Sequence, residues 1–198
     1  MSAFPAADPV APDASRSRDS PRRIAIVRAA LALAWAAALV IVVGDEVPST
    51  SSDVPIAAAA LLASYPAIDV VASIAGALGT DASARLLRVN AAIGVLAVVA
   101  IGAAAFGADA GATLVAFGAW AAVSGAMQLG VAVHLRTEGR QLPMIVSGGL
   151  STIAGLGFLA SAGMDDAHFA GIGGYMALGA LLYLLWAHRS RTAPQAAR

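Results

Sequence analysis

The chain of 198 residues is 59% hydrophobic and 12% charged, whereas soluble globular domains average roughly 45–50% apolar and 25% charged residues. This composition excludes an ordinary water-soluble protein. The lack of cysteine excludes disulfides and thiolate chemistry. A formal net charge of zero provides no basic surface of the kind that nucleic-acid binding requires.

Residues 1–23 are rich in Pro, Ala, Ser, Asp and Arg and have no apolar periodicity, which predicts a disordered tail. Six apolar segments follow, each long enough to cross a bilayer core that takes about 20 helical residues. Their lengths and their lack of alternating polarity favour helices over barrel strands. The expected spans are 24–43, 54–78, 88–107, 110–134, 142–163 and 167–188. Residues 24–188 are therefore predicted to form an all-α, six-helix transmembrane domain, followed by a short solvated tail at 189–198.

Basic and acidic residues lie in alternate connections between the predicted spans. Arginines occupy the N-terminal tail, the connections after spans two and four, and the C-terminal tail, while the other three connections carry Asp or Glu and no basic residue. The positive-inside rule then places both termini in the cytoplasm. The high alanine content and the use of arginine for every basic residue favour a bacterial source, and hence the bacterial plasma membrane.

An internal repeat of two helices is indicated by a shift of 55 residues, which aligns Tyr65 with Trp120 and Trp120 with Tyr175. The same shift aligns Gly94 with Gly149. Spans three and four match spans five and six, and spans one and two form a more diverged copy. Because each copy enters and leaves on the same side, we expect three parallel two-helix repeats around a pseudo-threefold axis near the membrane normal.

The segments FGAWAAVSGAMQLGVAVHLR (117–136) and SGGLSTIAGLGFL (147–159) resemble the repeat of the HdeD-like membrane proteins. In that family, a small-residue helix with spaced glycines is followed by a helix that carries an aromatic residue and then an Asp-Gly or Ser-Gly pair. Trp120, Ser124 and Gly125 match this pattern, whereas Tyr65 and Asp69 match in part because valine replaces the glycine after Asp69. Tyr175 with the following Gly-Ala pair matches more weakly. The resemblance implies six helices, a loose association with acid resistance and no established catalytic residues.

Asp69 is the one acidic or basic residue that we expect near the bilayer midplane, where an ionised Asp costs roughly 2.5–3.5 kcal/mol. Side chains four residues away share its helix face. The repeat places matching stripes on spans four and six, so the sequence predicts one central polar pocket, open to the cytoplasm, with Asp69 as its sole ionisable group. The candidate residues are Tyr65, Asp69, Ser73, Trp120, Ser124, Gln128, Tyr175 and Tyr183.

Two interpretations of Asp69 stay open. Burial disfavours the charged carboxylate, so we expect a neutral Asp69 unless a cation lies beside it. In the structural interpretation it hydrogen-bonds Ser124 or Gln128 across a helix interface, which adds about 0.6 kcal/mol. In the functional interpretation it serves a small proton-coupled carrier or channel.

The first expectation for function is a non-enzymatic plasma-membrane protein linked to acid or envelope stress, and the alternative is the carrier or channel. An enzyme is the weakest candidate, because Asp69 has no partner acid, base or metal set. We expect no cofactor, no metal and no nucleic acid. The expected partners are the bilayer and anionic lipid headgroups, which would contact a belt of cytoplasmic arginines, and a homo-oligomer is left open. The belt comprises Arg85, Arg88, Arg136 and Arg140.

Overall fold

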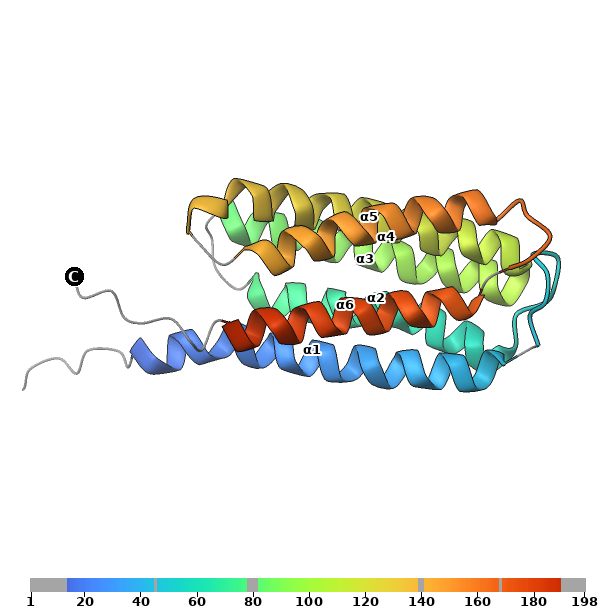
Figure 1. Cartoon of the computed structure of the whole chain (residues 1–198), viewed down its shortest axis with the longest axis horizontal. Coiled ribbons are helices and arrows are strands. Elements are labelled where there is room, and N and C mark those ends of the chain that lie inside the picture. The colour runs from blue at the N-terminus through green and yellow to red at the C-terminus, as the bar shows by residue number, and fades with distance from the viewer. Residues whose placement is uncertain (1–13, 45, 78–81, 139–140, 168, 190–198) are drawn as a thin grey trace, which may run out of the picture.

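The computed structural model describes residues 14–44, 46–77, 82–138, 141–167 and 169–189, which form a bundle of helices and contain no strand (Figure 1). Each of the six α-helices contains a stretch long and apolar enough to cross a membrane, which confirms the all-α class and the six predicted spans. The helices are α1 (Ala14–Val43), α2 (Ile56–Gly76), α3 (Ala82–Gly107), α4 (Ala110–His134), α5 (Leu142–Ser161) and α6 (Phe169–Arg189), with a short 3-10 helix η1 (Arg136–Glu138) before α5. The chain is thus a multi-pass integral membrane protein.

The first helix is longer than predicted. We expected a tail through residue 23, but α1 begins at Ala14, so residues 14–23 are helical. Once the apolar span has nucleated a helix, each further residue adds a backbone hydrogen bond at little cost, and polar residues can continue it. The rest of the predicted N-terminal tail, residues 1–13, and residues 190–198 of the C-terminal tail lie outside the described part of the chain.

The helices run alternately up and down, so that α1, α3 and α5 begin where α2, α4 and α6 end (Figure 1). We call this end of the bundle the Arg-rich end, because Arg23, Arg85, Arg136 and Arg189 lie near it. The connections at the opposite end carry acidic residues, with Asp53, Asp109 and Asp165 as examples. The structure therefore separates the charges along the long axis of the bundle.

The most extensive helix contacts pair α4 with α5, α2 with α3 and α1 with α6. The α4–α5 pair approaches closely through glycines: a Cβ atom placed on Gly155 would lie 2.3 Å from the backbone nitrogen of Ala122 and 2.6 Å from the carbonyl oxygen of Gly118. This is the small-residue packing that lets transmembrane helices touch. The glycines that the repeat aligns do not all share this role, because a Cβ atom on Gly149 would meet nothing within 4 Å.

Hydrogen bonds tie the connections together at the end opposite the arginines. Asp109 caps α4, since its Oδ1 accepts a hydrogen bond of 2.7 Å from the backbone N–H of Ala112. The α1–α2 connection covers the same helix start: the carbonyl oxygens of Thr50 and Ser52 accept hydrogen bonds of 2.7 and 2.9 Å from the first amides of α4. The Thr50 hydroxyl also donates to the carbonyl of Met164 in the α5–α6 connection, at 2.7 Å. All three connections at this end are therefore joined.

Candidate functional site

A cavity of about 730 Å³ lies inside the bundle and is lined by residues from all six helices. Its size falls in the range of about 300–1,000 Å³ that is usual for small-molecule sites. All eight candidate residues from the sequence line this one cavity, namely Tyr65, Asp69 and Ser73 of α2, Trp120, Ser124 and Gln128 of α4, and Tyr175 and Tyr183 of α6.

The cavity extends toward the Arg-rich end. There its walls include His134 and Leu135, at the end of α4, and Gln141, just before α5. Apolar side chains such as Leu87 and Met144 cover much of the wall between the polar groups. The cavity therefore combines a mostly apolar surface with a limited set of polar groups, which is typical of a site for an amphipathic ligand.

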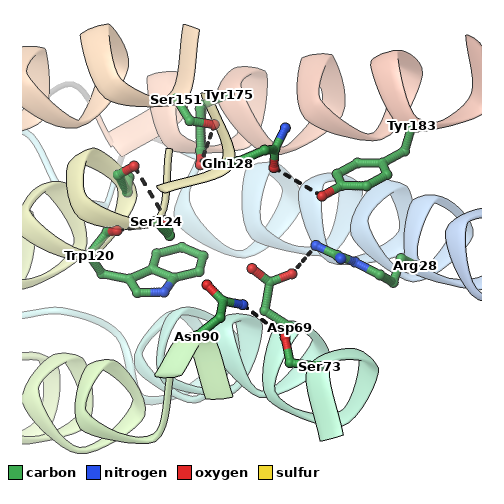
Figure 2. Close-up of polar contacts among 11 residues, drawn as sticks. Arg28, Asp69, Ser73, Asn90, Trp120, Ser124, Gln128, Ser151, Tyr175 and Tyr183 are labelled. Carbon is green, nitrogen blue, oxygen red and sulfur yellow. Dashed lines mark hydrogen bonds and ion pairs between the residues drawn. The ribbon is translucent and has the colours of Figure 1, made fainter. Parts of the chain in front are cut away.

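Asp69 forms an ion pair with Arg28 of α1, whose Nη2 donates a hydrogen bond to the Asp69 Oδ1 (Figure 2). Both side chains line the cavity, and each is 23% exposed. The guanidinium carbon of Arg28 also lies 4.4 Å from the centre of the Tyr183 ring, a cation–π contact. Arg28 is thus held between a carboxylate on α2 and an aromatic face on α6.

This ion pair corrects two sequence-based expectations. Asp69 is not the sole ionisable group of the pocket, because Arg28 shares it. Its partner is also not Ser124 or Gln128: the Ser124 hydroxyl donates instead to the carbonyl of Trp120, at 2.8 Å. Arg28 lies near the start of the first span and Asp69 toward the end of the second, and two consecutive antiparallel helices bring such positions to one height. An arginine inside the predicted first span was the available signal.

A second polar connection joins α6, α4 and α5. The Tyr183 hydroxyl donates to the Oε1 of Gln128 at 3.0 Å (Figure 2), and the Nε2 of Gln128 donates to the carbonyl of Met144 at 3.2 Å. The Gln128 amide therefore acts both as a hydrogen-bond acceptor and as a donor. The contact fixes the phenol ring on which the Arg28 guanidinium rests.

Two further hydrogen bonds involve residues that the sequence reasoning did not assign to the pocket. Asn90 of α3 donates to the hydroxyl of Ser73 at 2.8 Å, and the Tyr175 hydroxyl donates to that of Ser151 on α5 at 3.2 Å. A single amide or hydroxyl in an apolar span does not indicate which face of the helix it occupies. The one available signal was that Asn90 is a polar residue within a predicted span.

An aromatic cluster forms the floor of the cavity on the side away from the Arg-rich end. The Phe117 ring is central and fully buried; its centre lies 5.4 Å from that of Trp120, 6.0 Å from that of Tyr175 and 6.3 Å from that of Tyr65. Most of these contacts are edge-to-face, the arrangement that aromatic pairs favour. Phe158 of α5 completes the cluster, with its ring centre 5.7 Å from that of Phe117.

The site contains no evident metal centre: among the described residues, no group of three His, Cys, Asp or Glu side chains could hold a metal ion.

Comparisons with known proteins add no assignment. No family model, no curated protein and no solved structure matches this chain. The HdeD-like resemblance stays a prediction, and the interpretation of the site depends on its own geometry.

Proposed function

We propose that this protein is a non-enzymatic carrier that takes up a small amphipathic molecule in its central cavity. The observation that carries the proposal is the Arg28–Asp69 ion pair, both of whose members face a cavity that reaches the Arg-rich end of the bundle. Ionised groups within membrane spans are costly and usually mark a substrate or ion pathway.

A purely structural role explains the ion pair less well. Replacing a buried ion pair with packed apolar residues is often neutral or stabilising, so packing alone does not require the charges. In a solid bundle the two side chains would be enclosed, whereas here each keeps 23% of its surface exposed and lines the cavity. Charges that border open space are available to a ligand.

The shape of the site favours a carrier over a channel. The aromatic cluster around Phe117 lies beneath the cavity, and the three hydrogen-bonded connections lie beyond it. A channel needs a continuous path, whereas a carrier is open to one side at a time. We interpret this arrangement as the state of a carrier that is open toward its Arg-rich end.

The remaining proposals concern location and symmetry. The positive-inside rule makes the Arg-rich end cytoplasmic in a bacterial plasma membrane, with its arginines near anionic lipid headgroups. The three-repeat arrangement is supported by the pairing of α2 with α3, α4 with α5 and α1 with α6, and by the contribution of α2, α4 and α6 to one cavity. A role in acid or envelope stress, which the HdeD-like resemblance implies, is the alternative that we keep.

Site-directed cysteine labelling tests the proposal, because the natural chain contains no cysteine. Ser124→Cys places a thiol on the cavity wall, and Ser161→Cys places one at a buried position that is not part of that wall. A charged, membrane-impermeant thiol reagent is added to each side of sealed vesicles of known orientation. We expect labelling of Ser124→Cys from the cytoplasmic side and, during turnover, from the other side, with Ser161→Cys unlabelled.

The possible outcomes separate the candidates. Labelling of Ser124→Cys from the cytoplasmic side alone, however long the exposure, would replace the carrier with a static binding pocket. No labelling of Ser124→Cys from either side would contradict an accessible cavity and leave the structural or stress-related role.

A further inference from the structure

We propose that the ligand is a small amphipathic monocarboxylate, which binds Arg28 in place of Asp69 while Asp69 takes up one proton. This inference rests on the proposed function and names the substrate class of the same cavity. It follows from three features of the site: the charge balance around Asp69, the different proton chemistry of the two ion-pair partners, and the apolar wall.

The charge balance of the cavity is zero. The titratable groups that interact with Asp69 are Arg28 from α1, Tyr175 and Tyr183 from α6, and Tyr65 on α2 itself. The polar side chains that α3, α4 and α5 contribute to the cavity are uncharged, apart from His134 near the mouth. Arg28 is therefore the only formal positive charge next to Asp69 among the described residues at the base of the cavity.

The two partners respond differently to displacement. An anion that binds Arg28 releases a carboxylate into a poorly solvated site, and a carboxylate can accept a proton and become neutral. A cation that binds Asp69 would release the guanidinium, which does not lose its proton in proteins. An anionic ligand is therefore accommodated without an unpaired charge, whereas a cationic ligand is not.

The proton balance of the exchange is simple. The hydrogen bond between Arg28 and Asp69 breaks, and Arg28 pairs with the carboxylate of the ligand. The cavity reaches the Arg-rich end, so one proton from the buffered solvent there can transfer to the Asp69 carboxylate, which leaves the conjugate base of the buffer in solution. Anion and proton enter together, so the occupied cavity keeps the net charge of the empty one.

A carboxylate head and a short apolar tail fit the observed surface. The guanidinium presents five N–H donors in a planar fork that matches a carboxylate, while the Tyr183 ring contacts the guanidinium face. Beyond this pair, Leu87, Met127 and Met144 form apolar wall. The cavity of about 730 Å³ has room for a ligand of phenylpropionate size.

The inference is tested by calorimetric titration of the full chain in nanodiscs of phosphatidylcholine at pH 7. The probes are 3-phenylpropionate, its amide and 3-phenylpropylammonium, each corrected with empty nanodiscs. Titration in two buffers of different ionisation enthalpy counts the protons exchanged. We expect 3-phenylpropionate to bind with uptake of about one proton, and to bind at least tenfold more tightly than the ammonium probe.

Variants separate the two partners. Asp69→Asn should still bind 3-phenylpropionate but without proton uptake, because an amide has no site for that proton, and Arg28→Gln should weaken binding at least tenfold. The exposed residues Arg23 and Asp53 offer matched controls, and Arg23→Gln and Asp53→Asn should behave as the natural chain. The double variant Arg28→Gln/Asp69→Asn leaves no unpaired charge, so it should fold, as judged by circular dichroism, and fail to bind.

Three results would overturn the inference: 3-phenylpropionate binding without proton uptake in the natural chain, unchanged binding by folded Arg28→Gln, or tighter binding of the ammonium probe. Lack of binding by all three probes, with Ser124→Cys labelled from both sides, would overturn the ligand class and leave the carrier in place. If Ser124→Cys is also unlabelled, the proposed function itself fails.

Discussion

Replacing Gly155 with alanine should separate α4 from α5. The new Cβ atom would lie 2.3 Å from the backbone nitrogen of Ala122 and 2.8 Å from its Cα, whereas ordinary contact begins at about 3.4 Å. The helices must therefore part by about 1 Å at this point, because backbone atoms cannot rotate away. A gap of this size forfeits roughly a quarter to a half of the dispersion energy of each affected contact, and overpacking typically costs about 1–3 kcal/mol.

Gly157, two residues further along α5, supplies the matched control, because a Cβ atom there would meet nothing within 4 Å. Both alanines gain about 1 kcal/mol of helix propensity, so the difference between the variants isolates the clash. We expect the free energy of unfolding of Gly155→Ala to be about 1–3 kcal/mol lower than that of Gly157→Ala. Unfolding by sodium dodecyl sulfate in mixed micelles, followed by circular dichroism, measures this difference. Equal stability of the two variants would refute the close packing of α4 on α5.

Three further predictions use the same unfolding assay or a labelling assay. In a double-mutant cycle of Arg28→Gln and Asp69→Asn, the double variant should be more stable than the sum of the single losses predicts, by about 1–3 kcal/mol, because each single variant leaves one charge unpaired; an additive cycle would contradict the ion pair. Asp109→Ala should lower the free energy of unfolding by about 0.5–2 kcal/mol through loss of the α4 cap, and an unchanged value would contradict that cap. A thiol introduced by Asp165→Cys should react with an impermeant reagent only from the non-cytoplasmic side; reaction from the cytosol alone would invert the topology.

The sequence was sufficient to predict the helices, because spans of about 20 apolar residues have one physical solution in a bilayer. Their ends were harder to predict. The start of α1 at Ala14 was missed because polar residues outside the membrane give no apolar periodicity, even when they continue a helix.

The candidate site was predictable in its residues and not in its electrostatics. Spacing along each helix selected the residues of α2, α4 and α6 that line the cavity. The partner of Asp69 lies on another helix, 41 residues away in sequence, and the choice among polar groups at one height depends on how the helices rotate against each other. Helical spacing within one span gives no information on that rotation, so the sequence does not identify Arg28 as the partner of Asp69.

The hydrogen bonds that join the connections opposite the Arg-rich end stabilise that end of the bundle in its closed arrangement. In the carrier proposed above, opening toward that side would require rupture of the two hydrogen bonds from the start of α4 to Thr50 and Ser52 and of the bond from Thr50 to Met164. At a net value of about 1 kcal/mol each, these bonds would hold a conformer open to that side near 1% of the population or below. Exchange of the ligand with that side would then be limited by how rarely these connections separate. Substitutions in the α1–α2 connection that weaken the bonds would accelerate turnover without contacting the ligand.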